Sequence, residues 1–290
     1  MNMASNKLKV ILEMIKFEHT IFALPFAYLG MILGSTEKFN HFPAFAQFFW
    51  ITLAMVGARS AAMALNRLID RSIDKLNPRT SQRALPAGQL DLKEVVMFIF
   101  GSFLLLFIAA AQLSSLAIKL LPAAVVILVL YSYTKRFTWA CHFILGAAIG
   151  LAPLGAWVAV TNEISYPALI LFLTVALWTA GFDIVYATQD LEFDKKNGLF
   201  SIPAKFGLKN SLLTARIIHG LTILGLIYLV FITNLGWWYL AGVVIANFIL
   251  HYEHSIISPK DMSRLNTAFF TMNGILSVIV FVFVFLDLVI

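Results

Sequence analysis

The sequence predicts an all-α membrane protein, a bundle of nine transmembrane helices with its N-terminus in the cytoplasm. Hydrophobic residues make up 60% of the 290 residues and charged residues 12%, whereas a soluble domain is about half apolar and about a quarter charged. The apolar residues are grouped in long stretches, unlike the short alternating strands of a membrane β-barrel. The basic residues gather in alternate links between those stretches.

The apolar stretches define the predicted spans. A helix that crosses a bilayer needs roughly 20 mostly apolar residues. Nine stretches approach that length, and the links after the third and seventh are short. The predicted spans are residues 18–36, 46–68, 95–113, 116–133, 139–160, 167–189, 212–232, 237–251 and 266–288.

The positions of the basic residues predict the orientation. Of the 21 lysines and arginines, eighteen lie on the side of the N-terminus if the nine spans alternate, Lys38 and Lys119 lie on the other, and Arg59 falls within a span. Cytoplasmic loops are the ones enriched in lysine and arginine. The net charge of +6 is therefore explained by membrane topology, and no nucleic-acid partner is expected.

A single domain is predicted over residues 1–290, because no linker or shift in composition divides the chain. The first apolar stretch lacks a small-residue cleavage site, which predicts a retained span and not a signal peptide. Cys141 is the single cysteine, so a disulfide within the chain is excluded. The two longest polar links, residues 69–94 and 190–211, follow the second and sixth spans.

The first acidic motif, residues 66–74, lies at the C-terminal end of the second span. Asn66, Asp70 and Asp74 are spaced i, i+4 and i+8, which places three oxygen-bearing side chains on one face of a helix. The second motif, residues 183–194, ends the sixth span in the same way. Its face carries the side chains Asp183, Tyr186, Asp190 and Asp194.

Acidic side chains at a helix C-terminus are unfavourable by about 0.3–1 kcal/mol each, so both motifs require a cation. Oxygen ligands without a cysteine or histidine cluster suit Mg²⁺ or Ca²⁺. Two carboxylate rows that face each other could hold such ions against a diphosphate. The alternative is that these acids are solvated loop residues that balance nearby lysines and arginines.

A faint internal repeat relates the two motifs. At an offset of 120 residues, five positions are identical, which could arise by chance but also fits two half-bundles that share one site. The matched pairs are Asp70 and Asp190, Asp74 and Asp194, Lys75 and Lys195, Asn77 and Asn197, and Ser81 and Ser201.

Basic side chains near the motifs are candidate substrate ligands. Arg59 lies two helical turns deeper than Asn66. Its planar guanidinium group suits a substrate carboxylate. The alternatives are that it pairs with an acid of the site or extends its charged end to the membrane surface. Lys135 and Arg136 either clamp a diphosphate or anchor the helix at the membrane surface. Of Arg79 and Arg83, at least one is expected to contact phosphate. The histidines, including His219 and His254, are expected to pack without binding metal.

At these residues the chain resembles the UbiA superfamily of intramembrane prenyltransferases, from about residue 17 to the C-terminus. The resemblance rests on the nine-span layout and on the segments NRLIDRSID, RTSQRALPAG, YSYTKRFT, DIVYATQDLEFD and SIPAKFG. The LPAG element and the second motif are most similar to the 4-hydroxybenzoate polyprenyltransferase branch. Arg67 departs from the pattern, because many members carry an aspartate there.

The resemblance implies a bundle around a central cavity and a Mg²⁺-dependent transfer of a polyprenyl group from its diphosphate to an aromatic acid. It implies metal ligation by Asp70, Asp74, Asp190 and Asp194 with help from Asn66, and catalytic roles for these acids and Asp183. Substrate binding then falls to Arg59, Asn66, Arg79, Arg83, Lys135, Arg136 and Tyr186.

The expected setting is the bacterial inner membrane, with the site facing the cytoplasm and respiratory quinone synthesis as its purpose. The acceptor is expected to be 4-hydroxybenzoate, and a naphthoate or a futalosine-type menaquinone precursor is the alternative. An ion-coupled transporter is a distant alternative, because buried charge and a two-half repeat are also transporter features. The oligomeric state is not predicted.

Overall fold

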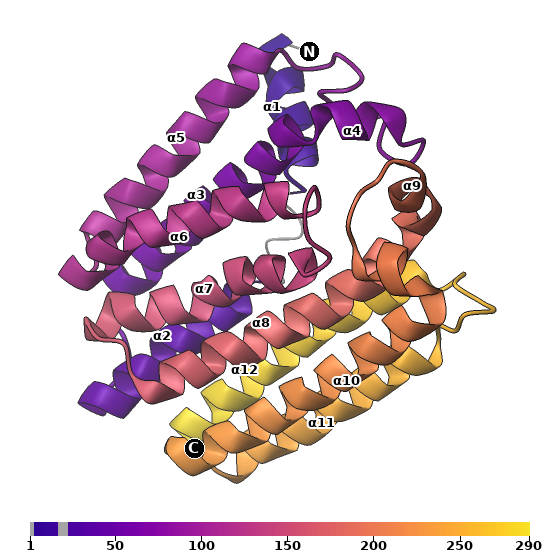
Figure 1. The fold of residues 1–290 in the computed structure, drawn as a ribbon. Helices are drawn as coiled ribbons and strands as arrows, with labels where there is room; N and C mark the ends of the chain where they lie inside the picture. The colour runs from indigo at the N-terminus through magenta and orange to yellow at the C-terminus, as the bar shows by residue number, and fades with distance from the viewer. Residues whose placement is uncertain (1–2, 17–22) are drawn as a thin grey trace.

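The computed structural model describes residues 3–16 and 23–290, and over these residues it is helical, with no strand beyond an isolated bridge between Ser258 and Asp261 (Figure 1). A 3₁₀ turn, Thr188–Asp190, links α8 to α9, and a π-helical turn, Thr267–Met272, precedes α12. The helices are α1 Met3–Met14, α2 Leu24–Phe39, α3 Phe45–Ile69, α4 Arg71–Leu76, α5 Leu92–Ala111, α6 Ser115–Thr134, α7 Cys141–Thr161, α8 Tyr166–Ala187, α9 Leu191–Lys196, α10 Ile202–Ile232, α11 Trp237–Ser255 and α12 Asn273–Val289.

Each predicted span overlaps one long helix, and seven helices of the described chain are long and apolar enough to cross a membrane. These are α3, α5, α6, α7, α8, α10 and α12 with their short extensions. Helix α2 has 16 residues, and residues 18–22 of the first predicted span lie outside the described residues. Helix α11 carries several polar side chains near its end. The all-helical class is confirmed; the count of nine spans and the orientation stay predictions.

Serine side chains set the beginnings of three long helices. The side chains of Ser114, Ser165 and Ser201 each accept a hydrogen bond from the backbone N–H three residues later, which satisfies a donor that a helix start leaves unpaired. Helix α10 consequently begins ten residues before its predicted start. It then bends at Gly207, whose positive φ of 79° interrupts the helix.

Glycine allows the central helices to approach closely. A methyl group at Gly30 of α2 would lie 2.2 Å from the carbonyl oxygen of Pro153 in α7. One at Gly146 of α7 would lie 2.2 Å from the carbonyl oxygen of Ala176 in α8. Small residues at such crossings are typical of membrane bundles, where close packing drives helix association.

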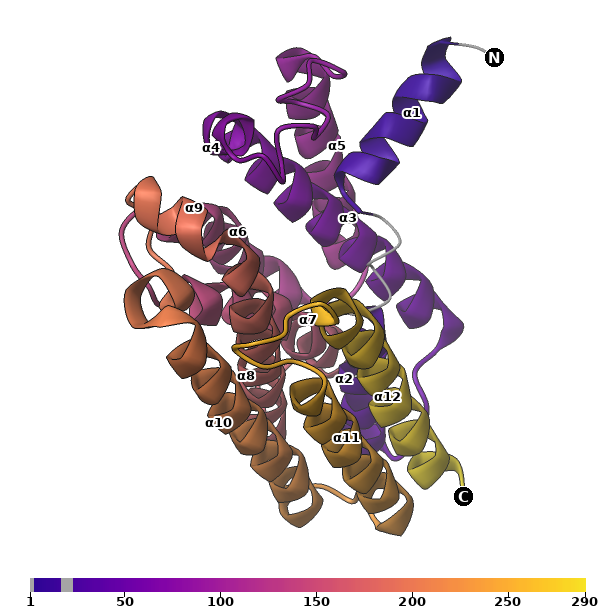
Figure 2. The ribbon, with the colours of Figure 1, turned by 90° about the vertical axis from the view of Figure 1, so that its right-hand side faces the viewer.

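The long helices form two groups joined through α2 and α7. Helices α3, α5 and α6 lie on one side of this pair, and α8, α10, α11 and α12 lie on the other (Figures 1 and 2). The largest apolar core lies between this central pair and the second group, around Trp157 of α7, Trp178 of α8 and Tyr239 of α11. The short helices α4 and α9 lie at the same end of the bundle, one beside each group, so the two acidic motifs meet there.

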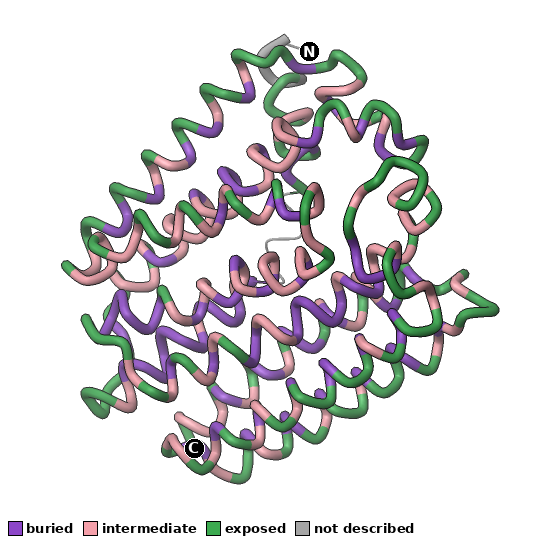
Figure 3. Tube along the Cα trace, in the orientation of Figure 1, coloured by how far each residue is buried: buried purple, intermediate pink, exposed green. Residues whose placement is uncertain are grey.

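The outer surface of the bundle is apolar. Exposed residues follow the outward sides of α5 and α10 (Figure 3). The most exposed large side chains include Phe45 at the start of α3, Phe231 near the end of α10 and Trp237 at the start of α11, which are 77–86% exposed. A soluble protein rarely exposes so much apolar surface. With seven helices able to cross a bilayer, this surface is that of an integral membrane protein.

Candidate active site

Both acidic motifs contain an aspartate at a helix break. Asp70 separates α3 from α4 with φ and ψ of −88° and 1°, and Asp190 precedes α9 with −99° and 7°. These values lie in a sparsely populated backbone region where many active-site residues are found. The prediction of one straight helical face is therefore wrong at both breaks. The matching conformations support the relation between the two halves that the faint repeat indicated.

Asp70 is the acid most enclosed by cations, and its side chain is 2% exposed. Lys135 Nζ lies 2.5 Å from one carboxylate oxygen, and Arg136 Nη2 lies 3.0 Å from the other. Asn66 Nδ2 also donates to Asp70 at 3.1 Å. Because a buried carboxylate is costly unless it is paired, Lys135 and Arg136 fix the position of the first break.

Arg67, the residue that departs from the family pattern, orients Asn66. Its Nη1 donates to Asn66 Oδ1 at 3.1 Å, and its Nε lies 3.4 Å from the carbonyl oxygen of Met14. With its oxygen engaged, the Asn66 amide nitrogen points to Asp70. Position 67 therefore supplies no carboxylate to the site. Its arginine instead connects the end of α1 to the first motif.

Asp74 is held by the loop that follows α4. Arg83 Nη1 lies 2.8 Å from both of its carboxylate oxygens, and Thr80 Oγ1 donates to its backbone carbonyl. The loop therefore folds back over the first motif and brings Arg83 to Asp74. That Arg79 or Arg83 contacts phosphate stays a prediction.

The same loop reaches across to the second motif. Arg79 pairs with Asp190 through Nη2 and through Nε at 3.0 Å, and its Nη1 donates to the Tyr186 hydroxyl at 2.9 Å. Asn77 Nδ2 donates to Asp190 at 2.9 Å. Burial lowers the pKa of the Arg79 guanidinium, but its bonds to Asp190 and Tyr186 outweigh that effect and raise the pKa above its ordinary value. Arg79 is a permanent cation between the motifs.

Asp194 completes the acidic set. It accepts a hydrogen bond of 2.9 Å from Ser201 Oγ, and the charges of Asp190 and Lys135 both act on it. The backbone carbonyl of Lys135 accepts a hydrogen bond of 2.7 Å from the N–H of Phe200. Lys135 therefore binds Asp70 of the first motif through its side chain and the segment after the second motif through its backbone.

Asp183 has a different surrounding from the other acids. It lies seven residues, or about two helical turns, before Asp190, and it accepts a hydrogen bond from His142 Nδ1 at 2.6 Å. The other ring nitrogen of His142 accepts from the N–H of Ile202 at 3.2 Å, so Nδ1 must carry the proton. This contact fixes Asp183 against α7 and the start of α10. A direct part in the reaction stays a prediction for Asp183.

An apolar cavity of about 330 Å³ lies between α3, α5, α6 and α7, and its lining on α3 ends at Met63, three residues before Asn66. Arg59 is the charged residue on its wall, and Tyr131, whose hydroxyl donates to the carbonyl of Ala62, is also on the wall. Arg59 lies on α3, on the face that carries Asn66 and Asp70 farther along. The site therefore combines a polar end and an apolar chamber.

The donor set fits a hard divalent cation. Asp70, Asp74, Asp190 and Asp194 are carboxylates, the ligands that Mg²⁺ prefers. The amide oxygen of Asn66 could join them only if it left Arg67, which binds it in this structure. Among the described residues each acid has a hydrogen-bonding partner from the surrounding loops, so the carboxylates are held in place before any ion binds.

Solved structures share this fold. A UbiA homolog from Aeropyrum pernix K1 matches with a TM-score of 0.84 at 30% identity, covering 93% of this chain and 98% of that one. A UbiA homolog from Archaeoglobus fulgidus, solved with GPP and Mg²⁺, matches with a TM-score of 0.73 over 97% and 100% of the two chains, and at 20% identity it supports the fold. The fold and the site thus define an integral-membrane prenyltransferase.

The sequence profile of the UbiA prenyltransferase family matches residues 23–275, and the chain belongs to this family. A 4-hydroxybenzoate octaprenyltransferase of Alcanivorax borkumensis is 34% identical over 209 residues, 72% of each chain. One of Vibrio campbellii is 29% identical over 265 residues, 90% of this chain and 88% of that one. The family and these relatives make the chain an aromatic prenyltransferase.

Three site contacts were not predicted from the sequence. Asn77 and Ser201 bind the second motif, and His142 binds Asp183. Asn77 and Ser201 both occur in the repeat at offset 120, which was a usable signal. No local pattern marks His142, because its partner comes from another helix.

Proposed function

We propose that this protein transfers a polyprenyl group from its diphosphate to an aromatic acid, first of all 4-hydroxybenzoate, in a Mg²⁺-dependent step of quinone synthesis. The observation that carries the proposal is the pair of matched helix breaks, at Asp70 and Asp190, which Arg79, Asn77 and Lys135 join into one site. The setting proposed is the bacterial inner membrane, with the polar end toward the cytoplasm.

The diphosphate occupies the polar end. Asp70, Asp74, Asp190 and Asp194, with Asn66, would hold Mg²⁺, which supplies charge neutralisation for the phosphate oxygens. Lys135, Arg136, Arg79 and Arg83 each lie within hydrogen-bonding distance of an acid. With Mg²⁺ on the acids, these four side chains would be available to the phosphate oxygens and would stabilise the negative charge on the leaving group.

The apolar chamber protects the allylic cation that forms when the diphosphate leaves. Water would capture that cation, so the reaction needs a cavity from which water is excluded. The chamber of about 330 Å³ has an almost wholly apolar wall. Arg59 on that wall is placed to hold the carboxylate of the acceptor through its planar guanidinium. The electron-rich ring then attacks the cation, and a carboxylate or the released diphosphate takes the ring proton.

The relatives named 4-hydroxybenzoate octaprenyltransferase favour 4-hydroxybenzoate as the acceptor. A naphthoate or a futalosine-type precursor also carries a carboxylate, so Arg59 suits it equally.

A turnover panel tests the function. The purified protein in nanodiscs, supplied with Mg²⁺ and a polyprenyl diphosphate, is offered 4-hydroxybenzoate and a dihydroxynaphthoate in parallel. The proposal expects prenylated 4-hydroxybenzoate and released diphosphate, both lost with EDTA and restored by Mg²⁺. If the protein prenylates the naphthoate but not 4-hydroxybenzoate, the naphthoate becomes the assigned acceptor. If turnover survives EDTA, the assignment of a required metal ion is wrong.

A further inference from the structure

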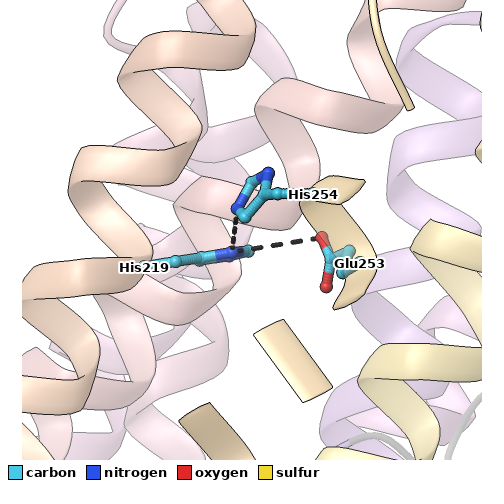
Figure 4. Close-up of side chains that lie close together, drawn as sticks. All are labelled: His219, Glu253 and His254. Atoms are coloured by element: carbon cyan, nitrogen blue, oxygen red, sulfur yellow. Dashed lines mark hydrogen bonds and ion pairs between the residues drawn. The ribbon is translucent and has the colours of Figure 1, made fainter. Parts of the chain in front are cut away.

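Far from the acidic motifs in sequence, three titratable side chains meet inside the second group of helices. His219 comes from α10, and Glu253 and His254 come from the end of α11 (Figure 4). His219 Nδ1 lies 2.9 Å from His254 Nε2 and 4.0 Å from Glu253 Oε1. The three facing atoms all lie within 4.8 Å of one another. They point toward a common centre.

Hydrogen bonds around the cluster leave one lone pair of His219 facing its centre. His219 Nε2 lies 3.2 Å from the backbone carbonyl of Trp178, and a carbonyl only accepts, so Nε2 carries the proton. Nδ1 is then the basic nitrogen, and without an ion it accepts a hydrogen bond from Nε2 of His254. A metal bound at His254 Nε2 would require His254 to carry its proton on Nδ1 instead. A histidine that donates its outer N–H to a carbonyl and turns the other nitrogen inward is the usual arrangement of a metal ligand.

The carboxylate of Glu253 is held from behind in the same manner. Asn273 Nδ2 donates to Glu253 Oε2 at 3.1 Å, and Asn273 Oδ1 accepts from Trp178 Nε1 at 2.7 Å. Trp178 therefore supports both sides of the cluster, through its carbonyl and through its indole. These contacts leave Glu253 Oε1 as the oxygen that faces the two histidines.

Burial makes this arrangement costly unless a cation completes it. Glu253 is 0% exposed and His219 is 2% exposed. Among the described residues, Glu253 Oε1 and His254 Nδ1 are buried atoms without a hydrogen-bond partner. A buried carboxylate without a cation costs several kcal/mol, and orphaned polar atoms in a native structure mark an unfilled requirement. The unpartnered Oε1 aims at the lone pair of His219.

We propose that His219, Glu253 and His254 bind a divalent transition metal, with Zn²⁺ as the ion of choice. Two histidines and a glutamate form a known Zn²⁺ donor set, with a fourth position left for water. Zinc–ligand bonds of about 2.0–2.1 Å place tetrahedral donors about 3.3 Å apart. The observed separations of 2.9 and 4.0 Å bracket that spacing. The nitrogen donors distinguish this site from the all-oxygen site of the acidic motifs.

Metal content of the full chain tests the proposal. The protein in nanodiscs is loaded with Zn²⁺, freed of excess ion, and measured by mass spectrometry of the metal. We expect one tightly held Zn²⁺ per chain that excess Mg²⁺ does not displace, and its loss in His219→Ala and Glu253→Gln. His251→Ala is the matched control, since His251 is exposed on the same helix, and it should keep the ion. Asp190→Asn should also keep it.

The outcomes that would overturn the proposal are as definite. No bound Zn²⁺ in the wild type, or equal binding by Glu253→Gln, would overturn the proposal, as would loss of the ion in Asp190→Asn. If the variants fail to fold, Co²⁺ is bound to the wild type instead. Intense visible absorption bands report tetrahedral nitrogen ligation and support the site, whereas weak octahedral bands place the ion among carboxylates and reject it.

Discussion

At the scale of single residues, the site depends on carboxylates that two cationic segments hold in place. Asp190 is the clearest case, because Arg79 and Asn77 of the segment that follows α4 both bind it. We therefore expect activity to require a carboxylate at position 190, and an acid at a neighbouring position should not substitute for it.

Replacing Asp190 by asparagine should therefore abolish most of the activity. The change keeps the shape of the side chain but removes a ligand charge, and losing one preorganised electrostatic contact costs about 10²–10³-fold in kcat. Prenyl transfer to 4-hydroxybenzoate measures the effect. Glu192→Gln is the control, because Glu192 is an exposed acid two residues away. Equal rates for both variants would contradict the assignment of Asp190.

Arg59 is expected to act on the acceptor and not on the prenyl donor. Arg59→Ala removes the planar fork from the cavity wall, so the KM for the aromatic acid should rise while the KM for the prenyl diphosphate changes little. Arg59→Lys keeps the charge but cannot bind bidentately, and it should restore only part of the affinity. Equal increases in both KM values would assign Arg59 to diphosphate binding or to structure.

At the scale of elements, the residue that caps a helix can contribute both to the stability of the fold and to the active site. Ser201 caps α10 and also donates to Asp194, whereas Ser165 caps α8 far from the acids. Each cap is worth about 1 kcal/mol. Ser201→Ala and Ser165→Ala should therefore lower the melting temperature similarly, but only Ser201→Ala should reduce prenyl transfer. Full activity in Ser201→Ala would show that the hydrogen bond from Ser201 to Asp194 is not needed for prenyl transfer.

The crossing of α7 and α8 should tolerate no added methyl group. Gly146→Ala would place a Cβ 2.2 Å from a backbone oxygen of α8, so the helices must separate, and overpacking typically costs about 1–3 kcal/mol. Gly155 lies on the same helix, and a Cβ there meets nothing within 4 Å. Thermal unfolding in nanodiscs should show a loss for Gly146→Ala and no loss for Gly155→Ala. Equal stability would indicate that the crossing can adjust.

The elements also show what sequence reasoning can reach. The acids and bases of the site could be predicted, because charge stands out in an apolar chain and helical spacing groups it. The breaks at Asp70 and Asp190 were missed, since the i to i−4 hydrogen bonding continues across Asp70 and no glycine or proline marks either break. The meeting of His219 with Glu253 was missed because it depends on how α10 packs against α11.

At the scale of the whole molecule, the orientation in the membrane is open to test. Cysteines replace Lys75 and Lys119 one at a time in a Cys141→Ser background, since both lysines are exposed and lie on opposite predicted sides. A membrane-impermeant thiol reagent applied to spheroplasts should label position 119 and spare position 75 until the cells are lysed. The reverse pattern would place the acidic motifs outside.

The mutual pairing of acids and bases in the ligand-free site has a thermodynamic consequence. On the proposed function, a diphosphate that arrived without metal would capture Lys135 and Arg79 and leave Asp70 and Asp190 bare in a poorly hydrated place. A metal ion that arrived without diphosphate would strand the cations in the same way. Each ligand therefore lowers the cost of the other, so their affinities are reciprocally linked. The resting site then discriminates against free phosphates and free ions, and it accepts the two when they come together.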